Sequence, residues 1–150
     1  MPVLIESPVG PLGFDTADGA VTRLIWGQPG NLEEGNLAAQ LRDELSAYFE
    51  GELPAFSVPV APRRSEFQQT FYDALCAIPF GETRTYGELA QDLGVSAQAI
   101  GQACGANPIA ILIPCHRVHA ADGLGGYSGA GGIEVKVTLL KLEGAGSLLI

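Results

Sequence analysis

The chain is poor in basic residues, which limits the ways in which it can bind a polyanion. Its 150 residues include eight Lys and Arg against seventeen Asp and Glu, a formal net charge of −9. Proteins that bind nucleic acid through broad electrostatic attraction normally carry a basic patch or a basic excess. Any DNA binding by this chain therefore has to rest on a local patch, helix N-termini and backbone amides, and we expect it to be weak at physiological salt.

Several features of secreted, membrane and zinc-binding proteins are missing. No N-terminal stretch has the basic-then-apolar form of a signal peptide, and no apolar run approaches the ~20 residues that a membrane helix needs. The cysteines are odd in number, lack Cys-x-x-Cys spacing, and fit reduced thiols better than a disulfide framework. We therefore expect a cytoplasmic protein that holds no metal and does not associate with membranes. The three cysteines are Cys76, Cys104 and Cys115.

The chain is instead rich in apolar residues and turn formers. Hydrophobic residues make up 47% of the sequence, alongside 20 glycines and 10 prolines, a composition typical of a globular protein with many turns. A length of 150 residues allows one domain of ordinary size or two small ones. Residues 53–64 contain three prolines, which predicts an extended segment linking two lobes.

The pattern of the first lobe predicts strands followed by a helix. Residues 3–5 form a short apolar run, residues 8–11 have the composition of a turn, and residues 21–26 are typical of a strand that is apolar on parts of both faces. Apolar residues then recur at helical spacing over residues 36–50, and Gly51 stands where a helix cap belongs.

Helical periodicity dominates the second lobe. Apolar residues form one stripe over residues 67–78, which ends at Pro79. Residues 85–88 have the pattern of a capping box that opens a helix over residues 85–93, and residues 97–106 are expected to form a second short helix. Two short helices across a tight turn predict a helix-turn-helix.

The second of these helices has an unusual composition. Gly94 breaks the helix before it and Ser96 is placed to cap it, while alanine and glycine fill most of its length. Such small side chains predict a slim helix that can approach another surface closely. Close packing against a neighbouring helix explains them equally well. A last helix is expected over residues 134–143, after a glycine-rich loop over residues 123–132.

The most informative residues are a cysteine and the histidine that follows it. Cys115 comes after the apolar run 109–113 and a proline, which predicts a thiol at the mouth of a buried element. The nucleophile in cysteine chemistry is the thiolate, so a reactive cysteine needs a nearby base or positive field. His116 and Arg117 are candidates for that role. A cysteine behind an apolar run is, however, most often a small buried hydrophobic residue. The adjacent cysteine and histidine are therefore weak evidence for a reactive thiol when taken alone.

Five short motifs follow one another along the second lobe. They are GETRTYGELA at 81–90, GANP at 105–108, PCHRV at 114–118, GYSG at 126–129, and a tail over 136–144 with Lys136 and Glu143. In order and spacing over residues 66–146, these motifs resemble the O6-alkylguanine-DNA alkyltransferase family, also called methylated-DNA–protein-cysteine methyltransferases. One such motif could arise by chance, but five in order make an accident very improbable.

The resemblance implies a fold and a reaction. The fold is α/β (α+β), with a small ribonuclease-H-like lobe over residues 1–60 and a mainly helical, winged-helix-like alkyltransferase domain over residues 66–146. The first lobe is similar to that of the family only in length and strand-helix pattern. The reaction is DNA repair without a cofactor, in which O6-alkylguanine is flipped out of double-stranded DNA and its alkyl group passes irreversibly to Cys115. O4-alkylthymine is a second candidate substrate, and a monomer with no obligate protein partner is expected.

The resemblance also implies catalytic roles, residue by residue. His116 would act as the base through a water, and Glu143 would orient its imidazole, in an orienter–base–nucleophile arrangement with Cys115. Asn107 would hold the turn beside the cysteine. Tyr86 would contact the phosphate next to the lesion and help to protonate the leaving guanine.

Substrate and DNA contacts are implied for a second set of residues. The backbone of Val118 and Ser128 would read the base edge, while Tyr127 walls the pocket and Lys136 lies near the substrate oxygen. The family usually fills the gap left by the flipped base with an arginine on the recognition helix, where this chain has Gln98. A glutamine side chain can occupy that gap in the base stack and form hydrogen bonds there, but it carries no charge. The implied set is Ala97, Gln98, Gly101, Arg117, Val118, Tyr127, Ser128 and Lys136.

Three other functions remain as alternatives. A non-catalytic, alkyltransferase-like protein would bind the lesion and flag it, but such relatives carry another residue in place of the cysteine, so Cys115 counts against it. A helix-turn-helix regulator would be expected to offer base-reading side chains, of which the Ala/Gly helix has few. A Cys-His-Glu hydrolase would turn over many substrates. The stoichiometry of transfer from methylated DNA separates all of them.

Overall fold

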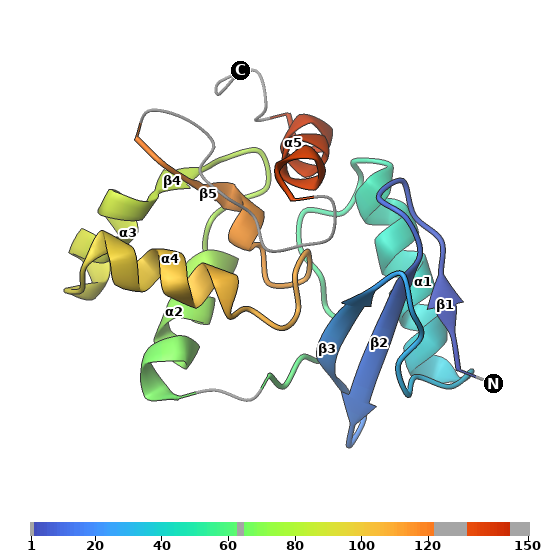
Figure 1. Cartoon of the computed structure of the whole chain (residues 1–150). Coiled ribbons are helices and arrows are strands. Elements are labelled where there is room, and N and C mark those ends of the chain that lie inside the picture. The colour runs from blue at the N-terminus through green and yellow to red at the C-terminus, as the bar shows by residue number, and fades with distance from the viewer. Residues whose placement is uncertain (1, 63–64, 122–131, 145–150) are drawn as a thin grey trace. The chain divides into compact units, whose positions relative to one another are not determined.

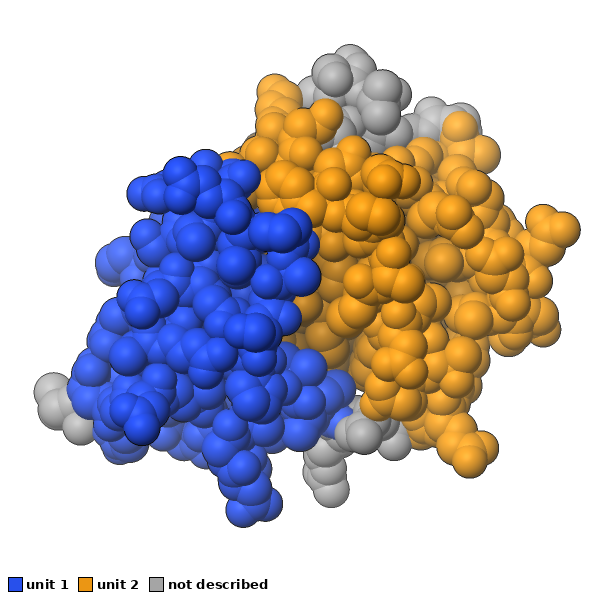
Figure 2. All heavy atoms as spheres, turned by 180° about the vertical axis from the view of Figure 1, so that it is seen from behind, with its two compact units in different colours: residues 1–63 blue, residues 64–150 orange. Residues whose placement is uncertain are grey.

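The computed structural model describes residues 2–62, 65–121 and 132–144 (Figure 1). The chain divides into two compact units, residues 1–63 and residues 64–150, which Figure 2 colours separately. Five α-helices and two small sheets are present in the described part, so the expected mixed α/β class is confirmed. None of the described helices has the length and apolarity of a membrane span.

The first unit contains a three-stranded antiparallel sheet with one helix alongside it (Figure 1). The expected strand at 21–26 and helix at 36–50 are confirmed, and Gly51 adopts the left-handed conformation that ends the helix (φ 76°). The central strand was not predicted. It places Leu12 and Phe14, both fully buried, in the core of the unit. The elements are β1 (Leu4–Ile5), β2 (Leu12–Ala17), β3 (Ala20–Trp26) and α1 (Asn36–Phe49).

The proline-containing segment that follows α1 is fastened to the first unit. The Glu44 carboxylate on α1 accepts hydrogen bonds from the backbone N–H of Ser57 (2.7 Å) and of Val58 (3.2 Å). Further along, Val21 of β3 donates its N–H to Pro59 (2.9 Å). This segment was expected only to link two lobes. The structure gives it a second role, because its backbone extends the hydrogen bonding of the sheet and the helix.

The second unit is mainly helical, and its helices begin where the sequence predicted. The short strands β4 and β5 pair in parallel, with Arg84 opposite Val118 and Thr85 opposite His119. This pairing joins the start of α3 to the segment that carries the cysteine. The elements are α2 (Glu66–Cys76), β4 (Arg84–Thr85), α3 (Tyr86–Leu93), α4 (Ala97–Gly105), the 3-10 turn η1 (Cys115–Arg117), β5 (Val118–His119) and α5 (Ile133–Leu142).

Local caps define the helix pair α3 and α4, which pack side by side (Figure 1). Thr85 and Glu88 form the expected capping box, with hydrogen bonds of 3.0 Å and 2.9 Å. Gly94 ends α3 in the left-handed conformation (φ 69°), and the Ser96 hydroxyl accepts from the N–H of Ala99 to start α4. The predicted pair of short helices and its turn are therefore confirmed.

The apolar run before the cysteine is buried but irregular. Residues 109–113 are all buried, as expected, yet they form consecutive turns in place of a helix or strand. Ile111 has a positive φ of 73°, an unusual conformation for a β-branched residue. Prolines on both sides, Pro108 and Pro114, disfavour regular structure here because they lack a backbone N–H. Hydrogen bonds from a neighbouring side chain hold the run in place.

Candidate active site

Cys115 is the first residue of η1 and is almost completely buried, with 4% of its surface exposed. Its N–H donates to the carbonyl of Ile113 (2.8 Å). Burial raises the pKa of the Cys115 thiol, while a hydrogen bond from the Asn107 side chain and the positive charge of Lys136 act in the opposite direction. The net direction is upward. The resting group at physiological pH is therefore a thiol, which must lose its proton to a base before it can attack.

The other cysteines occupy different environments. Cys76 is exposed at the last residue of α2, and Cys104 is half-buried near the end of α4. Burial raises the pKa of the Cys104 thiol to about 12, so it stays protonated at physiological pH. Because Cys76 is exposed, its side chain does not contribute to the buried core.

Asn107 lies between α4 and the buried run and bonds to both ends of that run. Its side-chain N–H donates to the carbonyl of Ile113 (2.9 Å), and its side-chain oxygen accepts from the N–H of Ile109 (3.1 Å). The Asn107 backbone N–H reaches Cys104 (3.2 Å). The side chain thus fixes the turn that leads to Cys115, the place in which the sequence analysis expected it.

A buried ionic cluster adjoins the thiol. Glu143, which caps the C-terminus of α5, accepts hydrogen bonds from His116 Nε2 (2.6 Å) and from Arg117 Nε (2.8 Å). The side chains of His116 and Glu143 are fully buried. Burial lowers the pKa of the His116 imidazole, and the hydrogen bond and charge of Glu143 only partly offset this. The imidazole is therefore neutral at physiological pH and can accept a proton.

Arg117, which was predicted to contact substrate or DNA, has a buried side chain with partners inside the protein. Its side chain is buried, and besides Glu143 it donates to the carbonyl of Ile78 (2.8 Å). The guanidinium also stands over the Phe80 ring, 5.9 Å from its centroid. A planar donor with several N–H groups can bond to a carboxylate and a carbonyl at the same time. Arg117 is an internal counter-charge for Glu143, and its contact with substrate or DNA stays a prediction.

Lys136 connects the cysteine, Val118 and Tyr86. It is 1% exposed, and its Nζ donates to the carbonyl of Val118 (2.6 Å) and stands 5.8 Å from the centroid of the Tyr86 ring. Burial lowers the pKa of Lys136, while the neighbouring thiols raise it. The Val118 carbonyl, expected to read a base edge, already accepts one hydrogen bond. A carbonyl has two lone pairs and can therefore accept more than one hydrogen bond.

The predicted DNA-contacting residues of α4 share its exposed face. Ala97, Gln98 and Gly101 are exposed, whereas Ile100 and Ala103 are buried on the opposite side. A Cβ added at Gly101 would meet no atom within 4 Å. Small residues therefore lie on both faces of α4, with Ala97 and Gly101 on the outer surface and Ala103 inside. Tyr127 and Ser128, the remaining predicted contacts, lie outside the described residues.

Two contributors to the site were missed by the sequence analysis. The carbonyl of Ile78 accepts a hydrogen bond from Arg117, a role that no side-chain pattern could reveal. Gly81 has a positive φ of 89°, and a Cβ there would come within 3.1 Å of the Glu143 carbonyl. That glycine opens the GETRTYG motif, so the signal was available. The loop after α2 needs it both for its conformation and for its approach to the end of α5.

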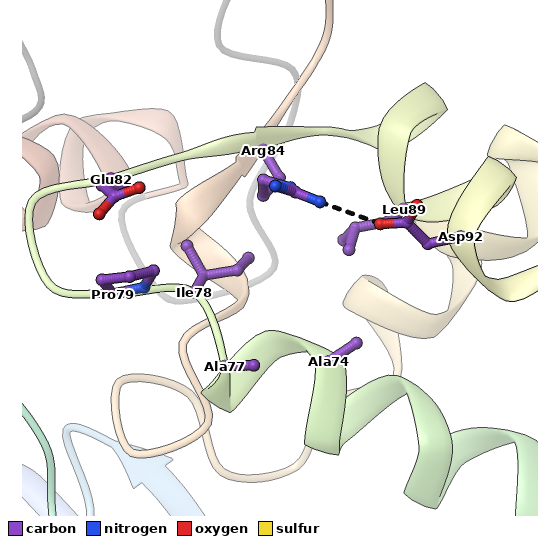
Figure 3. A pocket seen from close by; sticks show the side chains of 8 residues that line it. All are labelled: Ala74, Ala77, Ile78, Pro79, Glu82, Arg84, Leu89 and Asp92. Carbon is purple, nitrogen blue, oxygen red and sulfur yellow. Dashed lines mark hydrogen bonds and ion pairs between the residues drawn. The ribbon is translucent and has the colours of Figure 1, made fainter.

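A pocket elsewhere in the second unit lies outside this cluster (Figure 3). Its rim carries an ion pair between Arg84 and Asp92 (2.9 Å), and its walls come from α2, the following loop and α3. The volume of about 220 Å³ is below the ~300–1,000 Å³ typical of small-molecule sites. None of the residues predicted to act in catalysis lines it. The lining residues are Ala74, Ala77, Ile78, Pro79, Glu82, Arg84, Leu89 and Asp92.

Comparisons with known proteins agree with this geometry. Residues 66–145 match the family described as 6-O-methylguanine DNA methyltransferase, DNA binding domain. The methylated-DNA–protein-cysteine methyltransferase of Methanosarcina acetivorans is 42% identical over 95% of this chain and 97% of its own length. The protein of the same name from Mycobacterium leprae is 42% identical over 93% of this chain and 89% of its own length. The crystal structure of Mycobacterium tuberculosis OGT in complex with DNA superposes with a TM-score of 0.80 at 43% identity, covering 93% of this chain and 90% of that one.

Proposed function

The chain belongs to the 6-O-methylguanine DNA methyltransferase family, and we propose that it repairs DNA by accepting the alkyl group of O6-alkylguanine on Cys115. The enzyme class that the motifs predicted, a methylated-DNA–protein-cysteine methyltransferase, is confirmed by the family. One observation carries the assignment of residues. A buried thiol is followed by a neutral histidine whose Nε2 is held by a buried carboxylate.

His116 activates the thiol. Because the Glu143 carboxylate accepts from Nε2, the proton of the neutral ring is on Nε2 and the lone pair is on Nδ1. Nδ1 takes the proton of Cys115, directly or through one water. Burial raises the pKa of that thiol, so the reaction depends on such a base.

The Cys115 thiolate then displaces the guanine. Its sulfur attacks the alkyl carbon attached to O6, and the new sulfur–carbon bond forms as the carbon–oxygen bond breaks. The electron pair of that bond stays on the guanine, which takes up one proton supplied through Tyr86. The positive charge of Lys136 offsets the negative charge that develops on the oxygen. The thioether does not revert, so each chain acts once.

Double-stranded DNA carrying O6-alkylguanine is the proposed partner. The thiol of Cys115, a residue that is 4% exposed, cannot reach a base inside the stack, so the alkylated base has to leave the duplex. The exposed, uncharged face of α4, with Ala97, Gln98 and Gly101, is small enough to approach a duplex closely. The backbone of Val118, together with Tyr127 and Ser128, completes the proposed pocket. Glutamine at position 98 fills the vacated stack.

We also propose a fold type for each of the two units, from its helices and strands and from the family to which the chain belongs. The sheet and α1 support a ribonuclease-H-like lobe over residues 1–60. The α3–α4 pair supports a winged-helix-like alkyltransferase domain over residues 66–146. The monomeric state and the cytoplasmic location stay predictions.

The test of this function is the mass of the intact protein after incubation with methylated duplex DNA. We expect one added methyl group per chain and no further addition with excess substrate, with the group on the peptide that contains Cys115. Mapping to Cys76 or Cys104, or repeated turnover, would contradict the proposal. Binding to the lesion without any mass change would instead identify a non-catalytic lesion-binding protein.

Replacing Gln98 with arginine should tighten DNA binding and speed repair of duplex DNA. The guanidinium would fill the vacated stack and add one charge near the phosphates, and so steepen the salt dependence by about one unit of log–log slope. Free O6-benzylguanine needs no flipping, so its rate should change less. The measurement is the paired rates on duplex and free base.

A matched control separates charge from position. Gln102 is exposed one turn along the same helix, so Gln102→Arg adds the same charge away from the predicted flipping position. Gln102→Arg should steepen the salt dependence of DNA binding but should not increase the rate of alkyl transfer from duplex DNA to a comparable extent. Equal gains in both variants, or no gain in Gln98→Arg, would show that Gln98 does not stand at the flipping position.

A further inference from the structure

A histidine that the proposed reaction does not use joins two segments of the second unit. His119 is half-buried at the end of β5, and each of its ring nitrogens has a polar partner. Nδ1 lies 2.6 Å from the carbonyl oxygen of Ala120, and Nε2 lies 3.1 Å from the hydroxyl oxygen of Thr83. A carbonyl can only accept a hydrogen bond, so Nδ1 carries a hydrogen. In the neutral ring, Nε2 then accepts the hydrogen of the Thr83 hydroxyl.

This side chain restrains the segment that leads into α3. The backbone of His119 pairs with Thr85 in the parallel register of β4 and β5, and its ring reaches Thr83, two residues earlier in the same segment. Thr85 is the N-cap of α3, whose first residue is Tyr86. A pairing of two strands with two residues each is marginal by itself. The side-chain bond therefore supplies a second restraint on the position of Tyr86.

Tyr86 is joined to β5 by a second route, through Lys136. The carbonyl of Val118 accepts a hydrogen bond from Lys136 Nζ (2.6 Å). The same ammonium group stands 5.8 Å from the centroid of the Tyr86 ring. The contacts thus form a closed circuit, which runs from β5 through β4 to Tyr86 and returns through Lys136. In such a circuit each link limits the spacing of the others, so the bond between His119 and Thr83 helps to fix the tyrosine ring against the ammonium group.

We propose that His119 and Thr83 are positioning residues for alkyl transfer, whose hydrogen bond holds the Tyr86 hydroxyl in place to supply the proton that the leaving guanine takes up. This inference rests on the proposed function, which gives Tyr86 that role and places the charge of Lys136 near the substrate oxygen. Both groups serve bond breaking, so their spacing affects the rate. A shift of about 1 Å in a reacting group can lower a rate by as much as ~10²-fold.

The test begins with Thr83→Val, which removes the hydroxyl and keeps the shape of the side chain. Benzyl transfer from free O6-benzylguanine is measured with the full chain, because this substrate has no phosphate and reports the pocket alone. We expect the rate to fall by roughly three- to tenfold, the equivalent of one neutral hydrogen bond. Thr83→Ser keeps a hydroxyl and should keep most of the parental rate. Thr70→Val, the matched control, removes an exposed hydroxyl that bonds within α2 and should leave the rate unchanged.

His119→Val is the second variant, and valine suits the strand in which it lies. It removes the other partner of the same bond, so it should slow transfer about as much as Thr83→Val. The two substitutions together should be little slower than either alone, since the pair shares one interaction. Losses that multiply would show that the two side chains act separately and would overturn the inference.

The background of Tyr86→Phe separates positioning from general support of the fold. If the bond acts through the Tyr86 hydroxyl, Thr83→Val should add little to the loss that Tyr86→Phe already causes. An equal fold loss in both backgrounds would overturn the inference, as would parental rates in Thr83→Val or in Tyr86→Phe. A parent protein that carries no alkyl group on Cys115 after the reaction would refute the proposed function instead.

Discussion

Cys115→Ala is expected to abolish alkyl transfer while leaving the affinity for lesion-containing DNA largely intact. The thiol contributes only to bond formation, whereas binding would use the exposed face of α4 and the pocket for the flipped base. The loss should be complete, because neither remaining cysteine can replace Cys115 as the acceptor. Cys76 is exposed at the end of α2, outside the buried site, and Cys104 stays protonated because its pKa is about 12. The measurements are single-turnover transfer from a methylated duplex and titration of the same duplex by each protein.

Cys76→Ala is the matched control for this prediction. It makes the same chemical change at an exposed helix end, so transfer and binding should both stay at the parental level. Residual transfer by a folded Cys115→Ala protein would show that another group accepts the alkyl. Loss of DNA binding by that folded protein would show that the thiol contributes to recognition as well as to chemistry.

Local signals explain which parts of the fold could be predicted. Capping residues act within one helical turn, so the box of Thr85 and Glu88 and the cap at Ser96 located α3 and α4 closely. The strand β2 was missed although its turn to β3 contains Asp18-Gly19, a strong hairpin signal, and both residues have positive φ in the structure. The Asp-Gly turn, and with it the strand β2, was therefore predictable from the sequence.

The site was less predictable because its contacts join distant segments. Glu143 lies 26 residues beyond Arg117, and nothing in the local pattern says that the guanidinium turns inward to it. The resemblance placed Arg117 among the substrate and DNA contacts without indicating its partner inside the protein. The pairing of His116 with Glu143 was expected only through the resemblance. Side chains from separate elements meet only after packing, which the sequence of one segment does not specify.

Replacing Glu143 with glutamine is expected to lower both stability and the rate of transfer. The carboxylate is fully buried and accepts from His116 Nε2 and from two nitrogens of Arg117. Glutamine keeps the shape but removes the negative charge, which leaves a buried guanidinium without a counter-charge. Breaking such a pair costs about 3–5 kcal/mol, corresponding to a fall in Tm of roughly 10 °C for a chain of this size. Thermal unfolding measures this directly.

Glu134→Gln on the same helix is the matched control. Glu134 is exposed in the first turn of α5, so its replacement should change the free energy of unfolding by no more than about 0.5 kcal/mol. A similar effect of the two substitutions would mean that the buried cluster does not stabilise the fold as its geometry indicates.

The transfer rates of folded variants then separate the chemical role of Glu143 from its structural one. If the carboxylate acts by holding the His116 ring so that Nδ1 can take the thiol proton, its loss and the loss of the histidine remove the same contribution. Removing a general base costs about 10²–10⁴-fold. The variant carrying both His116→Ala and Glu143→Gln should therefore be little slower than the slower single variant, because residues that act as one unit are not additive. All rates are measured at a temperature below the lowest Tm of the variants. If the loss in rate of the double variant equals the product of the two single losses, the residues contribute independently. Glu143 would then be a structural counter-charge for Arg117 alone.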